Sequence, residues 1–291
     1  MINLMRHFTD KILPIVLMLL AISCVQVKPQ AKSDTPINER WTNNLGMIFV
    51  PVPHTDVAFS IYETRMKDFS AFAATNPRLD GTNWEHAFYH GISPVSPGPD
   101  YPVVNVSWND AVAFCAWLTT NELRAGTIHG KEFFRLPTDA EWSWAAGIGA
   151  LETNGTPKEK NSKIQNVYPW GTQFPPPPGA GNFADQTSLN YFTNWPHITN
   201  YNDGFATTSP VGSFTPNTLG IYDLAGNAME WCDDFYDGAH GARVLRGGAW
   251  INCGPKSLWS SYRNHAGASR YSVATGFRVV LVIKESEEAT Q

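Results

Sequence analysis

Glycine and proline interrupt this chain so often that long regular helices are excluded over most of its length. The 291 residues include 23 glycines and 21 prolines, together with 11 tryptophans. Glycine tolerates positive φ and proline fixes φ and removes a backbone donor, so both favour turns over regular elements. Hydrophobic residues make up 43% of the chain, which is enough for a large core. The composition therefore predicts a loop-rich fold in which buried aromatic rings hold irregular backbone in place.

Three segments carry the signals of short helices. Ser107 is followed three residues later by Asp110, and Thr138 is followed by Glu141, which gives a start signal before each apolar run. Thr64 is a third candidate N-cap. The expected buried faces have helical spacing and comprise Met66, Phe69, Phe72 and Ala73, then Ala111, Phe114, Cys115 and Leu118, then Trp142, Ala145 and Ala146.

Apolar or alternating runs between the turns predict strands. They cover residues 45–51, 59–62, 102–106, 243–250 and 275–282, whereas residues 76–101 and 150–166 have the composition of loops. No internal repeat or second domain is visible. We therefore predict a single α+β domain over residues 45–284, followed by a polar tail at 285–291.

The N-terminus has the pattern of an export signal. Arg6 and Lys11 precede eleven apolar residues, too few to span a bilayer, and Ser23-Cys24 follows. The run Leu20–Cys24 resembles a lipobox, in which Cys24 becomes lipidated; ordinary cleavage and an uncleaved signal anchor are the alternatives. We predict a signal peptide at 1–24, a polar tether at 25–44, and a protein exported to the bacterial periplasm or cell envelope, held at the membrane as a lipoprotein.

Charge and cysteine content limit the remaining functions. The net charge is −5 without a basic stripe, so nucleic-acid binding is not expected. Cys115 lies in a helical apolar pattern and is expected to be a buried small hydrophobe. Cys232 and Cys253 could form a disulfide, which the sequence leaves open. His86 and His90 have i,i+4 spacing, but they precede glycine and proline and are more often incidental loop residues.

Two motifs are the most specific features of the chain. They read Gly-Asn-Ala-Met-Glu-Trp at 226–231 and Arg-Val-Leu-Arg-Gly-Gly-Ala-Trp at 243–250. Further motifs, among them FRLPTDAEWSWAA, SPVGSF and GFRVV, occur in a fixed order between Gly46 and Ile283. Together they resemble the formylglycine-generating enzyme family, also called sulfatase-modifying factor domains. The resemblance implies an elaborated C-type-lectin-like α+β fold with little regular secondary structure, and an oxidase that converts a substrate cysteine to formylglycine.

The resemblance also implies two calcium sites. For the first site it assigns side-chain oxygens of Asn182 and Asp203 and backbone oxygens of Phe183 and Phe205. For the second it assigns carbonyls of Gly226 and Ala228 and the carboxylate of Glu230. Oxygen ligands of these kinds are compatible with Ca²⁺. Alternatively, Asp203 and Glu230 only accept hydrogen bonds from turn amides.

The redox centre of the family is incomplete in this chain. The family holds Cu(I) between two cysteines that follow a Gly-Gly-Ser-Tyr stretch. Here Cys253 falls within one residue of the first cysteine, Trp259 occupies the place of the second, and Ala249 replaces the serine. Soft Cu(I) favours paired thiolates, and an indole nitrogen only donates. We therefore do not expect copper chemistry, and Cys253 is a doubtful catalytic residue.

A polar cleft near the same place is the remaining candidate site. Its expected lining is Trp259, Arg263, Asn264 and Arg270, although the two arginines could equally be ion-pair residues. The sequence thus predicts an exported, calcium-stabilised module that binds a peptide or small ligand. The alternatives are a formylglycine-generating oxidase with an atypical thiol site, and another oxidoreductase or maturation enzyme on the same fold, because fold does not fix function.

Overall fold

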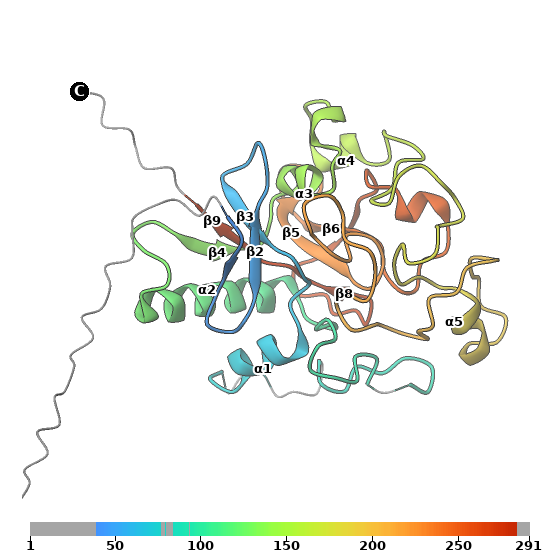
Figure 1. Cartoon of the computed structure of the whole chain (residues 1–291), viewed down its shortest axis with the longest axis horizontal. Coiled ribbons are helices and arrows are strands. Elements are labelled where there is room, and N and C mark those ends of the chain that lie inside the picture. The colour runs from blue at the N-terminus through green and yellow to red at the C-terminus, as the bar shows by residue number, and fades with distance from the viewer. Residues whose placement is uncertain (1–38, 77–78, 80–83, 93, 284–291) are drawn as a thin grey trace, which may run out of the picture. The chain divides into compact units, whose positions relative to one another are not determined.

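The computed structural model describes residues 39–76, 79, 84–92 and 94–283, which belong to one compact unit, Thr35–Gln291 (Figure 1). The predicted signal peptide, the lipobox, most of the tether and the tail at 285–291 lie outside the described residues. No helix in the described part of the chain has the length and apolar character needed to cross a membrane.

A five-stranded antiparallel sheet joins the two ends of the domain. Its strand order is β1 (Trp41–Thr42), β2 (Ile48–Pro51), β3 (Val57–Ser60), β9 (Val280–Val282) and β4 (Phe133–Arg135). Strand β1 pairs with β2, with Trp41 opposite Phe49. The domain therefore begins before residue 45, and the predicted tether at 25–44 is too long at its C-terminal end.

A second sheet contains part of each of the two specific motifs. Its order is β7 (Asn264–Gly267), β6 (Ala242–Arg246), β5 (Met229–Phe235) and β8 (Thr275–Gly276), and only β5 and β8 run parallel. The strand predicted at 243–250 ends at Arg246, because Gly247 and Gly248 have φ of 91° and 73°. The segment 275–282 supplies two strands, one to each sheet. No strand forms at 102–106, where Asn105 has φ of 59°.

The capping signals locate two helices correctly and a third one residue early. The helices are α1 (Met66–Ala73), α2 (Trp108–Ala125), α3 (Asp139–Ala145), α4 (Pro157–Lys160) and α5 (Gln186–Tyr191), with 3₁₀ turns at Gly149–Leu151 and Pro255–Leu258. Ser107 and Thr138 accept from the amides of Asp110 and Glu141, both at 3.2 Å. In α1 the cap is Arg65, not Thr64, and the backbone amide of Thr64 donates instead to the Phe277 carbonyl of the adjacent segment.

Buried indoles hold the loops, as the composition predicts. Trp142, Trp231 and Trp250 are completely enclosed. The Nε1–H of Trp231 donates to the Val106 carbonyl at 3.0 Å, and that of Trp250 donates to the Val273 carbonyl at 3.1 Å. Both carbonyls belong to segments without regular structure. Each ring therefore contributes apolar burial and also donates a hydrogen bond that a loop carbonyl needs. The predicted α+β architecture with little regular secondary structure is confirmed.

Candidate functional site

Two Gly-Asn pairs, Gly181-Asn182 and Gly226-Asn227, pack directly against each other. The Asn227 amide donates to the Asn182 carbonyl at 2.9 Å, and Asn182 Nδ2 donates to Asn227 Oδ1 at 3.2 Å. A Cβ on Gly226 would lie 2.2 Å from the Asn182 carbonyl oxygen, and φ at Gly226 is 82°. Only glycine fits there. The segments assigned to the first and second calcium sites are therefore neighbours.

The first set of predicted calcium residues comes together around Asp203. Its Oδ2 accepts from the Phe183 amide and its Oδ1 from the Phe205 amide, both at 2.8 Å. This is the turn-amide bonding considered as the alternative to calcium. However, Asn182 Oδ1 is buried and accepts no hydrogen bond within the described part of the chain. An oxygen in that condition is costly unless an unseen donor or cation satisfies it.

A second carboxylate, Asp185, adjoins Asp203 and was not predicted. Asp185 is fully buried, and it accepts from the amides of Thr187, Ser188 and Asp203. Burial, with a smaller contribution from Asp185, raises the pKa of Asp203 to about 7. No ion pair among the described residues includes either carboxylate. A dication would balance this charge, but the described residues contain no group of three or more Asp, Glu, His or Cys side chains that could hold a metal ion. Asp185 could have been found from the sequence by the Asp-x-Thr-Ser pattern that begins α5, which is typical of a helix N-cap.

The second set of predicted calcium residues does not fit a dication. Glu230 is completely buried, and its Oε1 accepts from Arg278 Nη2 at 2.6 Å. Its Oε2 accepts from Trp142 Nε1 at 2.9 Å and from Arg278 Nε at 3.0 Å. A guanidinium therefore already balances the charge that Gly226, Ala228 and Glu230 were expected to offer to calcium. Carboxylates paired in this way are ion-pair partners rather than free metal ligands.

Two further buried carboxylates surround this ion pair. Glu63 accepts from the Ala228 amide at 2.9 Å and from Asn227 Nδ2 at 2.7 Å. Burial raises the pKa of Glu63 well above its ordinary value and raises the pKa of Asp223 to about 6. Arg278 is the cation that lowers both pKa values. Glu63, Asp223, Glu230 and Arg278, here called the Arg278 cluster, thus contain more acidic than basic groups.

The described cysteines lie in three separate parts of the core. Cys115, Cys232 and Cys253 are all free thiols, so the disulfide left open by the sequence is not formed. Cys115 packs in the largest hydrophobic cluster, as predicted, and Cys232 packs in the cluster around Trp142. Cys253 is half-buried beside Trp259, and burial raises its pKa. One thiol at this place does not fit the two-thiolate copper centre of the family.

The four residues predicted to line a polar cleft do not do so together. Arg263 is only 1% exposed; its Nε donates to Asp139 at 2.9 Å and its Nη2 to Glu152 at 2.6 Å. Asn264 lies in β7 and Arg270 is exposed. Trp259 is half-buried, and its Nε1 has no partner among the described residues. Arg263 is therefore the structural ion-pair residue that the sequence offered as the alternative.

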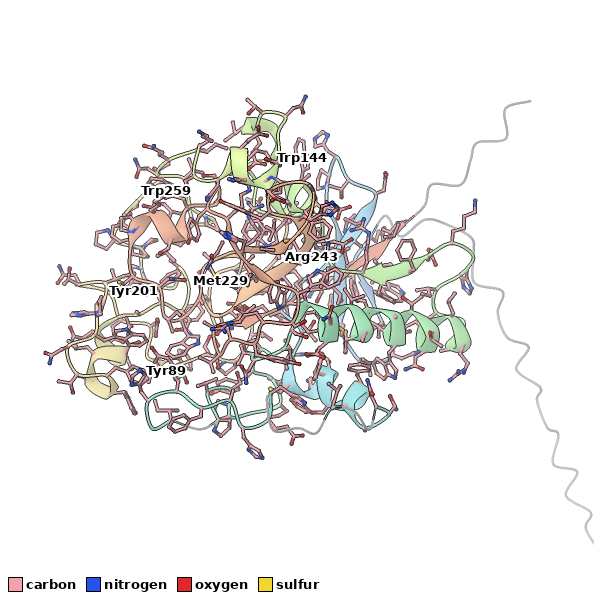
Figure 2. All side chains as sticks on the ribbon, turned by 180° about the vertical axis from the view of Figure 1, so that it is seen from behind. Tyr89, Trp144, Tyr201, Met229, Arg243 and Trp259 are labelled. Atoms are coloured by element: carbon pink, nitrogen blue, oxygen red, sulfur yellow. The ribbon has the colours of Figure 1, made fainter. Side chains whose placement is uncertain are left out.

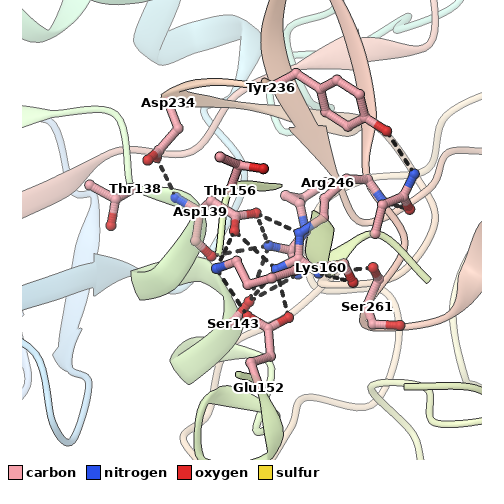
Figure 3. A network of polar contacts seen from close by, with 12 residues as sticks. Thr138, Asp139, Ser143, Glu152, Thr156, Lys160, Asp234, Tyr236, Arg246 and Ser261 are labelled. Atoms are coloured by element: carbon pink, nitrogen blue, oxygen red, sulfur yellow. Dashed lines mark hydrogen bonds and ion pairs between the residues drawn. The ribbon is translucent and has the colours of Figure 1, made fainter. Parts of the chain in front are cut away.

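Arg263 belongs to a buried charge network centred on Asp139. Figure 3 shows this network around Asp139, with Lys160 and Arg246 labelled. The Asp139 carboxylate accepts from Arg246 at 2.5 Å, from Arg263 at 2.9 Å and from Lys160 at 2.9 Å. Burial alone would raise the pKa of Asp139, but the three cations outweigh it and hold the pKa well below its usual range. The network joins α3, α4 and β6, so it connects two short helices to the second sheet.

An open aromatic pocket of about 290 Å³ lies elsewhere, on two loops. It is lined by Tyr89, His90, Tyr191, Phe192, Thr193, Asn194 and Trp195. Trp195 lies 4.6 Å from Phe192 and 5.6 Å from Tyr89 between ring centroids. Trp250, three residues before Cys253, underlies both Tyr89 and Trp195 at 5.1 and 5.7 Å. Figure 2 places Tyr89 and Trp259 toward the same loop-rich end of the domain.

Sequence reasoning missed this pocket because Tyr89 and His90 lie in the segment 76–101, which it treated as loop, and because it made no prediction for residues 191–195. Tyr89 and Ile92 pair through both backbone hydrogen bonds, and His90 and Gly91 between them have φ of 44° and 93°. That is the geometry of a two-residue hairpin turn. The turn presents His90, taken as incidental, at the pocket. The dense aromatic run at 191–195 was the available signal.

Comparison with known proteins gives a consistent family match. The model of the sulfatase-modifying factor enzyme 1-like domain matches residues 34–283. The inactive Cα-formylglycine-generating enzyme 2 of Bos taurus is 36% identical over 204 residues, covering 66% of this chain and 55% of that protein. The formylglycine-generating enzyme of Bos taurus is also 36% identical, over 189 residues, covering 60% and 41%.

A solved structure supports the fold alone. PvdO from Pseudomonas aeruginosa superposes with a TM-score of 0.56 at 20% identity, covering 86% of this chain and all of that one. The chain spans about half the length of the curated relatives it matches. One of those relatives is named as inactive and the other as an enzyme, so similarity to them does not decide between the two functions.

Proposed function

Because the chain belongs to the sulfatase-modifying factor enzyme 1-like family, with its C-type-lectin-like α+β fold, we propose that it is a ligand-binding member without two-thiol copper chemistry. In this proposal a peptide or small ligand places an aromatic group in the pocket over Trp250, and calcium stabilises the loop around Asp203. In this proposal residues 1–24 export the protein and a lipidated Cys24 holds it at the membrane. Membrane fractionation should then show that Cys24→Ala loses the association seen for wild type, and unchanged association would indicate an uncleaved signal anchor instead.

The observation that carries the proposal is the isolation of Cys253. Cys253 packs against a cluster that includes Leu258, as Trp259 also does, whereas Cys232 and Cys115 are buried in other clusters. No cation is among the causes that shift its pKa, which burial raises, so the reactive thiolate is not favoured. A two-coordinate Cu(I) site would need a second sulfur there. Trp259 cannot supply one.

Binding, in contrast, needs only an accessible and shaped surface. No Asp, Glu, Lys or Arg side chain lines the aromatic pocket, and its polar groups are the hydroxyls of Tyr89, Tyr191 and Thr193, the Asn194 amide and the His90 imidazole. Tyr191 is 64% exposed at its edge. A few aromatic faces with several hydrogen-bonding groups form a typical site for a small ring or an aromatic side chain.

The binding proposal predicts that Trp195→Ala weakens binding of an aromatic probe. We expect N-acetyltyrosine amide to bind at millimolar concentration and the variant to lose roughly fivefold in affinity, since one aromatic contact contributes on the order of 1 kcal/mol. NMR titration measures both. Tyr271→Ala is the matched control, because Tyr271 is 41% exposed and does not line the pocket. Equal affinity in wild type and Trp195→Ala would reject this pocket.

The proposal also predicts no copper-dependent conversion of a cysteine-containing sulfatase peptide. The peptide is incubated with the protein and Cu(I), and its mass is read for the aldehyde. Formation of aldehyde that disappears in Cys253→Ser would establish the oxidase alternative instead. A Trp259→Cys variant then shows whether the scaffold retains the old geometry, because gain of Cu(I) binding requires the new sulfur to reach Cys253.

Calcium is expected to raise the thermal midpoint by binding the folded state alone. The response should be lost in Asp203→Asn, which removes the uncompensated carboxylate next to Asp185. It should persist in Glu230→Gln, however unstable that variant is, because Glu230 is neutralised by Arg278. Melts with added Ca²⁺ or chelator measure this. Identical midpoints for wild type in both conditions, with no calcium by elemental analysis, would remove calcium from the proposal.

A further inference from the structure

The outer side of α2 carries no charge over about three helical turns. None of residues 111–121 is charged. Ala116 and Thr120 are nevertheless exposed, and Leu123, about one turn further along, is 42% exposed. A helix at a protein surface usually turns charged and polar side chains toward water. This side of α2 is instead apolar or weakly polar, which is typical of a surface that contacts another apolar surface.

An open, largely apolar groove of about 450 Å³ continues this surface onto β4. Val112, Ala116 and Thr119 belong to its helix wall, and Phe133 belongs to its strand wall. Phe133 is 38% exposed. An apolar occupant would bury apolar surface here without stripping water from many polar groups. Val112, Ala116, Thr119, Leu123 and Phe133 are here called the α2–β4 face.

The charged side chains that line the groove already have partners of opposite charge. Arg135 donates to both oxygens of Glu141 at 2.6 Å. The Asp233 side chain is 46% exposed, and Arg243 Nη1 lies 4.0 Å from its carboxylate. An ionic ligand would have to compete with these neighbours. The groove therefore favours an uncharged, apolar occupant.

Both ends of the described domain lie beside the α2–β4 face. Near the N-terminal end, the backbone and side-chain amides of Asn44 donate to Glu122 of α2, both at 3.1 Å. Trp41 of β1 stacks on Phe134 of β4 with 6.3 Å between ring centroids. At the C-terminal end, the last strand, β9, pairs with β4. Figure 1 shows β4, β9 and the end of α2 together on the side of the domain away from α5.

The position of the N-terminal end indicates which apolar surface could cover this face. The predicted lipid is on Cys24, and the segment 25–38 can span at most about 50 Å. A tether of that length gives the face a high effective concentration near the bilayer, so weak apolar contacts suffice. Glu285, Glu287 and Glu288 follow the last strand in the sequence, so attraction to anionic lipids is not expected to drive the contact. Hydrocarbon is therefore the chemistry that fits the face.

We propose that the α2–β4 face rests on the membrane surface, with Leu123 and Phe133 inserted among the acyl chains and hydrocarbon filling the groove. The groove shares no lining residue with the aromatic pocket over Trp250. The inference rests on the membrane tether of the proposed function, but not on the ligand proposed there.

The test is photolabelling of the full chain in phosphatidylcholine vesicles that contain a phospholipid with a diazirine in its acyl chain. Light releases N₂ from the diazirine, and the carbene inserts into C–H bonds within the hydrocarbon. Mass spectrometry then locates the lipid adducts. We expect them in peptides that cover residues 108–136, and not at Leu151, which is 60% exposed outside the face. Equal labelling at Leu151, or none at 108–136, would overturn the proposal.

A matched pair of variants tests the face itself. Ala116→Glu places a charge at an exposed position of the face and should lower labelling of residues 108–136 at least roughly fivefold, because a carboxylate is costly to bury in hydrocarbon. Ala150→Glu makes the same change at an exposed position beside Leu151 and should label as wild type. Unchanged labelling in Ala116→Glu would contradict the proposal.

The remaining outcomes separate this inference from the tether. If wild type sediments with the vesicles but residues 108–136 are not labelled, the tether stands and only the membrane contact of the face is rejected. If wild type does not associate with vesicles at all, both are rejected. Self-association of wild type that Ala116→Glu abolishes, without lipid adducts, would assign the α2–β4 face to a second copy of the chain instead.

Discussion

Replacing Asp139 with asparagine is expected to lower the free energy of unfolding by about 3 to 5 kcal/mol, because removing one partner of a buried ion pair leaves the other charges unpaired. Arg246, Arg263 and Lys160 all donate to this carboxylate, and the side chains of both arginines are completely buried. Asparagine keeps the shape but offers one neutral acceptor to three cations. Urea denaturation at pH 7 measures the loss.

Asp100→Asn is the matched control for Asp139→Asn. Asp100 pairs with Lys67 at 2.7 Å, a distance similar to those in the Asp139 network, but its side chain is 56% exposed. Exposed pairs contribute about 0 to 1 kcal/mol. If both substitutions cost the same, burial of the network does not determine its contribution.

The stabilisation from Asp139 also has a defined pH window. The pKa of Asp139 is held below its usual range in the folded protein, so the folded state binds its proton less readily than the unfolded state. Stability from this group is therefore present above its unfolded pKa of about 3.9 and is lost as pH falls through the folded pKa. The difference between wild type and Asp139→Asn should be constant from pH 8 to 5 and should shrink below about pH 4.

Local signals in the sequence predicted the elements that depend only on local chemistry. Ser107 and Thr138 cap helices because their side-chain oxygens reach amides three residues away, a distance set by helix geometry alone. The strand predicted at residues 102–106 does not form, and the reason is non-local. Val103 and Val104 are buried, but Asn105 adopts a left-handed conformation, and its amide donates to the carbonyls of Ser272 and Thr275.

The candidate site was only partly predictable for the same reason. Motif order brought Asn182, Asp203 and Glu230 to attention, but sequence cannot show that Arg278, 48 residues beyond Glu230, is its partner. The sequence also allowed Arg263 to be either a cleft residue or an ion-pair residue. Its contact with the buried Asp139, 124 residues away in the chain, identifies it as an ion-pair residue. In contrast, Cys253 and Trp259 lie within one short segment, so the sequence alone predicted that a single thiol occupies the place of the family's cysteine pair.

Replacing Arg278 with methionine is expected to destabilise the protein by about 3 to 5 kcal/mol, because it removes the cation from a group of buried acids. Glu230 would lose the donors on both its oxygens from Arg278 and keep only Trp142. The carbonyls of Ser60 and Tyr222 would also lose their Arg278 donors. Urea denaturation at pH 7.5 measures the effect, with the exposed residue Arg270→Met as the matched control.

The double variant Arg278→Met with Glu230→Gln separates charge from packing. If unpaired charge dominates, neutralising Glu230 should recover part of the loss in stability, and the effects of the two changes should not add.

Lowering the pH should also recover part of the stability lost in Arg278→Met. The pKa values of Glu63 and Asp223 are raised in the folded state. Any stabilisation of the fold by these two groups is therefore greatest at a pH below their unfolded pKa values, and it is lost as pH rises through their folded pKa values, about 6 for Asp223. Removing Arg278 raises both pKa values further, so the deficit of Arg278→Met should be larger at pH 8 than at pH 5. A deficit independent of pH, without recovery in the double variant, would mean that Arg278 stabilises this core by packing and carbonyl hydrogen bonds rather than by charge.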